Sequence, residues 1–227
     1  MSTLPTPVTS TSAGTPDPAG LEIVARVPIR PTPAGAFRAA ARPRPDPVAR
    51  LLLALLREPV TPVLGEAAAC RLAGTDDLPT ALELLEVAQS EGLVEGLDEP
   101  QRAPEGDLEV LVPQLLEDLS DLGEVLLADS DGLPMWSQGF EAGLATALAA
   151  MSGDVGALSE RHAGVIAEAV GGTASAWALV DGVGASHVGC WPLHIGDHRF
   201  VLVLRGLPRM HHPSFTQLIW LLVRRYG

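Results

Sequence analysis

The chain has 227 residues, which suits one domain with additions or two small domains, and 47% of them are apolar. Its formal net charge is −13, and all fifteen basic residues are arginine, so the chain contains no lysine. This absence excludes a Walker A phosphate-binding loop and Schiff-base catalysis, because both chemistries need a lysine amine.

The N-terminal stretch, residues 1–45, is rich in proline. Ten of the twenty prolines lie between Pro5 and Pro47, and mostly Ser, Thr, Gly and Ala separate them. Such a composition is typical of a disordered tail, because it buries too little apolar surface to offset the entropy of ordering. Leu21–Ile29 has strand-like apolar content and is either a short docking motif or a stray apolar patch.

Residues 46–112 have the pattern of three helices followed by two strands. Leucines recur at helical spacing, Asp77 suits a helix N-cap, and Gly74 and Gly92 suit helix ends. The predicted elements are helices at Val48–Arg57, Gly65–Leu72 and Leu78–Ser90, and strands at Leu93–Leu97 and Leu108–Val112. This order resembles a winged-helix domain, with the two strands and the polar loop between them as the wing.

A winged helix often binds DNA, but the charge of this segment argues against it. From Asp46 to Pro113 the chain has fourteen acidic residues and four arginines. The outer face of the third predicted helix would carry Glu83, Glu86 and Glu91, where a DNA reader needs basic side chains. DNA is therefore not an expected partner, and we expect a protein-interaction or spacer module.

Residues 113–227 have a second pattern of alternating helices and strands. An Asp131-Gly132 pair between two apolar runs indicates a hairpin, and glycines at Gly153 and Gly156 are expected to break or loosen the long helix. The predicted elements, in chain order, are a helix at Pro113–Leu122 that ends at Gly123, strands at Glu124–Ala128 and Leu133–Ser137, a long helix at about Phe140–Val170, strands at Ser175–Val180, His187–Leu193 and Arg199–Arg205, and a helix at Ser214–Arg225.

That order resembles the roadblock family, of the dynein light-chain and bacterial polarity-regulator type. Residues 123–134 resemble its first hairpin, and residues 192–204 resemble its last two strands. The expected fold class is therefore α+β: a disordered tail (1–45), a winged-helix-like domain (46–112) and a roadblock-type α/β sandwich (113–227). The resemblance implies a homodimer formed through the long helix and the strand that follows it, with an interface at Phe140, Leu144, Ala147, Leu148, Met151, Ala176, Trp177 and Ala178.

Members of this family serve Ras-like small GTPases or act as adaptors in signalling complexes. The resemblance therefore implies a non-catalytic dimeric adaptor or regulator of a small GTPase system; the alternative is an atypical transcription regulator with a winged helix and a roadblock dimerisation domain. A small enzyme is disfavoured because no convergent acid–base set is visible, and we expect no catalytic residue and no cofactor.

Metal binding is not expected either. Cys190, His194 and His198 lack the fourth ligand of a structural zinc site. Asp129 and Asp131 open like a calcium loop, but the later positions of that loop do not match. The two cysteines do not make a disulfide framework, and the sequence shows neither a signal peptide nor an apolar run long enough to span a bilayer, so we expect a cytoplasmic protein.

Overall fold

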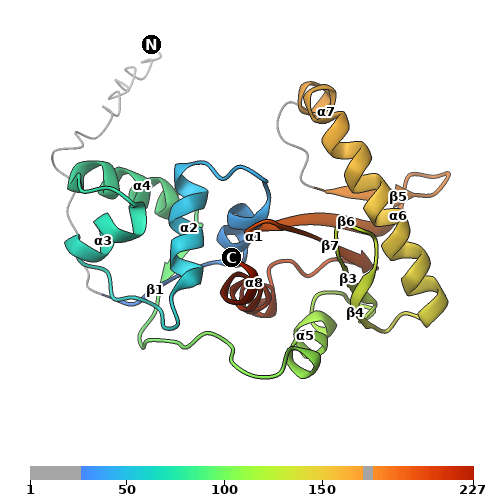
Figure 1. The fold of residues 1–227 in the computed structure, drawn as a ribbon, viewed down its shortest axis with the longest axis horizontal. Coiled ribbons are helices and arrows are strands. Elements are labelled where there is room, and N and C mark those ends of the chain that lie inside the picture. The colour runs from blue at the N-terminus through green and yellow to red at the C-terminus, as the bar shows by residue number, and fades with distance from the viewer. Residues whose placement is uncertain (1–26, 171–175) are drawn as a thin grey trace, which may run out of the picture.

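A five-stranded antiparallel sheet organises the C-terminal half of the chain (Figure 1). The structure is a computed structural model that describes residues 27–170 and 176–227. The strands lie in the order β4-β3-β7-β6-β5, so β4 and β5 form the two edges of the sheet. Their bounds are Val125–Ala128 for β3, Pro134–Gln138 for β4, Trp177–Val180 for β5, Ser186–Ile195 for β6 and His198–Arg205 for β7.

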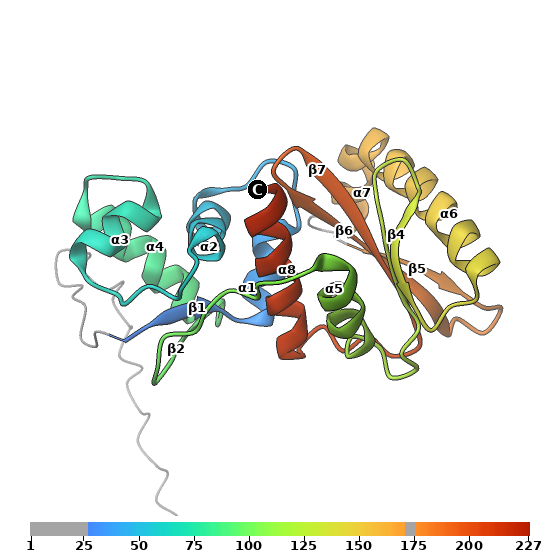
Figure 2. The ribbon, with the colours of Figure 1, turned by 60° about the horizontal axis from the view of Figure 1, so that its bottom comes forward.

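Each face of this sheet is covered by helices because its strands alternate two sets of apolar side chains. On β7, Phe200 and Leu202 belong to a core shared with helices α5 (Leu108–Glu117) and α8 (Pro213–Tyr226). Val201 and Val203, between and beyond them, belong to a second cluster under helix α6 (Ala142–Arg161). Figure 2 shows α6 on one side of the sheet and α5 and α8 on the other.

Helix α8 is shared by the two halves of the molecule. Nine of its fourteen residues are buried, because the sheet and α5 lie against one side and helices α1 (Pro33–Ala40) and α2 (Pro47–Arg57) lie against the other (Figure 2). The Trp220 indole donates to the carbonyl of Glu58 at 2.9 Å, and the Arg224 guanidinium donates to the carbonyl of Arg57 at 2.7 Å. Both bonds occupy backbone acceptors at the end of α2, and one continuous core joins the halves.

The helical half follows the predicted order of three helices and a strand. After α2 come α3 (Glu66–Ala73), α4 (Leu78–Ser90) and β2 (Val94–Gly96). Gly74 and Gly92 end α3 and α4 with φ angles of 69° and 67°, the left-handed conformation that glycine adopts without strain. The Asp77 carboxylate caps α4 by accepting from the backbone of Thr80 at 3.0 Å.

The tail prediction is wrong for residues 29–40, which belong to the fold. Strand β1 (Ile29–Pro31) pairs antiparallel with β2, and the Arg30 guanidinium forms an ion pair with Glu95 at 2.7 Å. Pro33 lies in the first turn of α1, where a missing backbone N–H costs nothing. The prolines here therefore lie at the end of a strand and at the start of a helix rather than in a disordered tail. Residues 1–26 lie outside the described part of the chain.

The second predicted wing strand, Leu108–Val112, is also wrong, because these residues begin helix α5. Asp107 caps the helix by accepting from the backbone of Glu109 at 3.0 Å. Val112 and Leu116, four residues apart, are both buried in the core, so the apolar pattern has helical rather than strand periodicity. Strand β2 pairs with β1 instead of with a second wing strand. The predicted domain boundary at residue 113 falls inside α5.

The prediction that this first helix runs from Pro113 to Leu122 is wrong at both ends. Helix α5 ends at Glu117, and Gly123 has a φ of 65° in the turn before β3 rather than at the helix end. The remaining order of two strands, long helix, three strands and helix is confirmed. The α+β class is therefore confirmed, with the helical half built onto the sheet through α8.

Candidate interaction surface

Helix α6 lies very close to the sheet because its inner face is made of small residues. Ala145, Ala149 and Ser152 are buried along this face. A Cβ added at Gly153 would lie 3.0 Å from the Cα of Gly132, in the turn between β3 and β4. Gly153 therefore allows α6 to approach this turn closely. The prediction that Gly153 and Gly156 break or loosen the helix is wrong, because α6 runs without interruption for 20 residues.

The long helical region ends in a second, shorter helix. The backbone leaves the helical conformation at His162, and α7 (Ala163–Val170) follows. The end of α6 is fixed by Arg199, whose side chain is only 13% exposed. Its guanidinium forms an ion pair with Glu160 at 2.7 Å and donates to the carbonyl of Ser130 at 3.0 Å. Arg199 thus ties the end of α6 to the turn between β3 and β4.

The residues predicted for the dimer interface divide into an inner and an outer set. Leu148 is buried, and Phe140, Met151 and Trp177 pack partly buried against the cluster under α6. Leu144 is 40% exposed. The remaining predicted interface residues are exposed and small: Ala147, Ala176 and Ala178. The inner set holds α6 on the sheet, which leaves the outer set on the molecular surface.

One border of the outer face of α6 carries an apolar stripe with a seven-residue repeat. Leu144, Met151 and Leu158 are spaced by seven; Leu144 and Leu158 are exposed, and Met151 between them is partly buried against the cluster under α6. Ala147 lies one turn after Leu144. Leu158 is 47% exposed although it is a large apolar side chain. A seven-residue apolar repeat keeps one face of a helix against a partner helix over its whole length. The interface predicted on the long helix stops at Met151 and does not include Leu158.

Strand β5 forms one edge of the sheet. Its partner in the sheet is β6, so its other edge has no partner strand within the described residues. The Trp177 indole donates to the Ser159 hydroxyl at 3.0 Å and joins β5 to α6. Leu179 shares the α6 side of the sheet and is 45% exposed. Ala178, opposite Gly189 in register, lies on the other face of the sheet.

The three side chains considered for metal binding do not converge. Cys190 lies buried in the cluster under α6, and burial raises the pKa of its thiol to about 11. His194 lies on the same face, and burial lowers the pKa of its imidazole. His198 lies on the opposite face of the sheet, where its ring packs against Phe200 and Tyr226. Within residues 27–170 and 176–227, no group of three or more His, Cys, Asp or Glu side chains could hold a metal ion.

The predicted hairpin turn is built on Asp129. Its carboxylate accepts from the backbone N–H groups of Asp131 at 3.0 Å and Leu133 at 2.8 Å. This side chain therefore organises a tight turn between β3 and β4. The structure agrees here with the prediction of a hairpin from the Asp-Gly pair.

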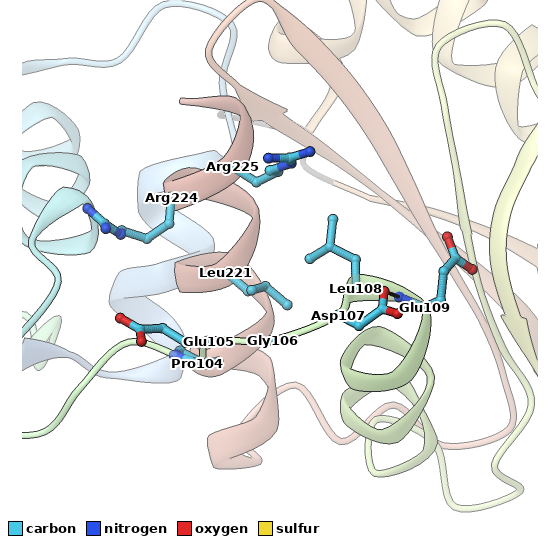
Figure 3. A pocket seen from close by; sticks show the side chains of 9 residues that line it. All are labelled: Pro104, Glu105, Gly106, Asp107, Leu108, Glu109, Leu221, Arg224 and Arg225. Carbon is cyan, nitrogen blue, oxygen red and sulfur yellow. Dashed lines mark hydrogen bonds between the residues drawn. The ribbon is translucent and has the colours of Figure 1, made fainter.

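A groove of about 510 Å³ lies between residues 104–107, the start of α5 and the end of α8 (Figure 3). Acidic and basic side chains line it, but Asp107 caps α5 and Arg224 binds the carbonyl of Arg57. In Figure 3, Arg224 and Glu109 point away from each other. These groups serve the fold, and the groove's described lining shows no convergent acid–base pair.

The outer face of α4 is acidic, as the sequence predicts. Glu83, Glu86 and Glu91 are all exposed. A helix with this face would be repelled by the phosphate backbone of DNA.

No helix in the described part of the chain has the length and apolar character needed to cross a membrane.

Comparison with known proteins found no matching family model and no curated protein with significant similarity. Among solved structures, the roadblock/LC7 domain from Streptomyces avermitilis is 15% identical and matches 53% of this chain and 98% of its own, with a TM-score of 0.38. Myxococcus xanthus MglB is 16% identical and matches 55% of this chain and 90% of its own, with a TM-score of 0.31.

Proposed function

We propose that this protein is a homodimeric, non-catalytic adaptor or regulator of a Ras-like small GTPase signalling system. Its C-terminal half has the order of elements that the roadblock resemblance implies, from α5 to α8. Its helical half, a winged-helix-like module, serves as a protein-interaction or spacer unit. The observation that carries the proposal is the surface formed by the outer face of α6 and the open edge of β5.

Two copies associate through this surface. The stripe of Leu144, Met151 and Leu158 on one α6 packs against the same stripe on the other, with Ala147 allowing the helices to approach closely. The open edges of the two β5 strands pair, which continues the sheet across both copies and removes an exposed edge. Exposed apolar side chains such as Leu179 then become buried.

The helical half contributes recognition of protein rather than nucleic acid. The exposed carboxylates of α4 disfavour the alternative of a DNA-binding transcription regulator, which needs a basic surface at that helix. Because α2 is bonded to α8, this module is held rigidly against the sheet. A partner GTPase would therefore meet one continuous body rather than two loosely linked domains.

Dimerisation is tested by placing a carboxylate at Ala147. Ala147→Glu brings two like charges together at the centre of the contact, which costs several kcal/mol, so we expect the dimer dissociation constant to rise about 100-fold or more. Sedimentation equilibrium measures this constant directly. Ala67→Glu, on the exposed side of α3, is the matched control and should leave the constant unchanged. Equal dimerisation of both variants contradicts the interface.

The GTPase link is tested by affinity capture from native lysate in GDP and in a non-hydrolysable GTP analogue. Retention of a small GTPase in one nucleotide state, and its loss with the Ala147→Glu variant, supports a dimeric regulator. Capture of the same proteins in both nucleotide states, without a GTPase among them, rejects the link. Full-length protein is used because both halves share one core.

A further inference from the structure

A second groove, with an apolar lining, lies on the other side of the molecule from α6. It has a volume of about 510 Å³ and forms where the start of α1, strand β6 and the segment between β7 and α8 meet. The residues that line it include Pro33, Phe37, Trp191, Met210 and His211. Two aromatic rings and a proline make this lining unlike the charged groove of Figure 3.

The aromatic walls of this groove are held in place by their own surroundings. The Trp191 ring lies across Gly189, where an added Cβ would be 2.2 Å from a ring carbon. The Phe37 ring packs on Phe215 with centroids 6.3 Å apart. Within residues 27–170 and 176–227 the indole N–H of Trp191 makes no hydrogen bond, so this donor is available to a ligand.

A preformed aromatic groove with a free donor suits an extended proline-rich peptide. Such peptides adopt a polyproline II helix, lose little entropy on binding, and place prolines against aromatic rings while their backbone carbonyls accept hydrogen bonds. The chain carries a sequence of this kind in the segment that precedes its described part. Pro5, Pro7, Pro16 and Pro18 all lie within residues 1–26.

The chain enters the described fold close enough to the groove for this segment to reach it. Val27 precedes β1, and Thr32 at the far end of β1 lines the groove. Five extended residues span about 17 Å, so about six of the preceding residues cover the return path. Asp17, between Pro16 and Pro18, carries a negative charge that suits the N-terminal end of α1.

We infer that this groove binds the chain's own proline-containing segment, residues 4–18, and so is occupied within a single chain. A tethered ligand has an effective concentration in the millimolar range, so a weak peptide affinity is enough for occupancy. This inference concerns the face opposite α6 and does not depend on the proposed dimer or on a GTPase partner.

The test is photo-crosslinking in the full-length protein. His211 is replaced by the photoreactive amino acid benzoylphenylalanine, and a matched variant carries it at Leu133, an exposed position in the turn between β3 and β4. Light and isotopically heavy chains are mixed before irradiation, and crosslinked peptides are identified by mass spectrometry. We expect crosslinks from position 211 to residues 4–18 within one isotope class, and no such crosslinks from position 133.

Two results overturn the inference. One is an absence of crosslinks from position 211 to residues 4–18, and the other is crosslinks that join light chains to heavy chains, which would assign the groove to a second copy. A further pair of variants tests the groove itself. Ala34→Glu adds a carboxylate that repels Asp17 and suits the first turn of α1, so the crosslinks should be lost, whereas Ala34→Ser should retain them. Retention in both variants also contradicts the inference.

Discussion

Removing a buried side chain from the helical half should destabilise the sheet half by the same amount. Leu52 in α2 is completely buried in the core that continues through α8 to the sheet. Leu52→Ala removes three buried carbon atoms and leaves a cavity, at a cost of about 2–5 kcal/mol. With about 2–4 °C of Tm per kcal/mol for a chain of this size, a cost of about 3 kcal/mol lowers the Tm by about 6–12 °C.

The tryptophans make this prediction testable with two probes. All four tryptophans lie in the C-terminal half: Trp136, Trp177, Trp191 and Trp220. Their fluorescence therefore follows the sheet and α8, whereas far-ultraviolet circular dichroism follows all the helices. We expect both probes to shift together in Leu52→Ala, as one cooperative transition requires. Leu133→Ala, at a position 60% exposed, should leave the Tm nearly unchanged. An unchanged fluorescence transition beside an earlier loss of helical signal would refute the shared core.

Three further results are expected. Gly189→Ala places a methyl group inside the indole that crosses that residue, so we expect a loss of about 1–3 kcal/mol in denaturant unfolding; an unchanged midpoint would argue against the ring position. With its pKa raised to about 11, the Cys190 thiol should react far more slowly than the half-buried Cys70 with Ellman's reagent at pH 8, and Cys70→Ser should remove the fast phase. The His187 Nε2 lies 2.8 Å from the Asp181 Oδ2 and holds the pKa of Asp181 below its ordinary value. The stabilisation that this pair contributes is therefore present at neutral pH and is lost as pH falls through the lowered pKa. His187→Ala should raise the pKa of Asp181 in a carboxyl NMR titration.

Local chemistry made part of the fold predictable from the sequence. The Asp131-Gly132 turn, the left-handed glycines at Gly74 and Gly92 and the N-cap at Asp77 act within a few residues of themselves. The alternation of β7 is equally local, because neighbouring side chains must face opposite sides of a sheet. These elements were therefore predicted at nearly their observed bounds.

The errors arose where distant residues decide the structure. Strand β1 is stabilised by β2, more than sixty residues away, through backbone pairing and the Arg30–Glu95 ion pair. The start of α5 has apolar residues in a strand-like run, and its helical state depends on burial of Val112 against α8 and the sheet. Neither contact is visible in a short window of sequence.

The candidate surface was predictable in outline but not in detail. The roadblock resemblance implied an interface that includes Leu144 and Ala147, and the structure leaves both residues exposed. Leu158, which the predicted interface does not include, follows Gly153 and Gly156. Gly153 packs against Gly132 in the turn between β3 and β4, and a Cβ added at Gly156 would meet the Arg199 guanidinium. Close packing between segments thus decided whether glycine interrupted the helix or allowed its approach.

The position of α8 has a consequence for the synthesis of this protein. Domains generally fold as units while the chain emerges from the ribosome, N-terminal parts first. Here α1 and α2 emerge early, yet the helix that completes their core follows every other described element in the chain. The nascent helices must therefore keep apolar surface exposed until translation reaches α8. We expect the growing chain to be prone to aggregation during this interval, because transiently exposed apolar surface promotes it.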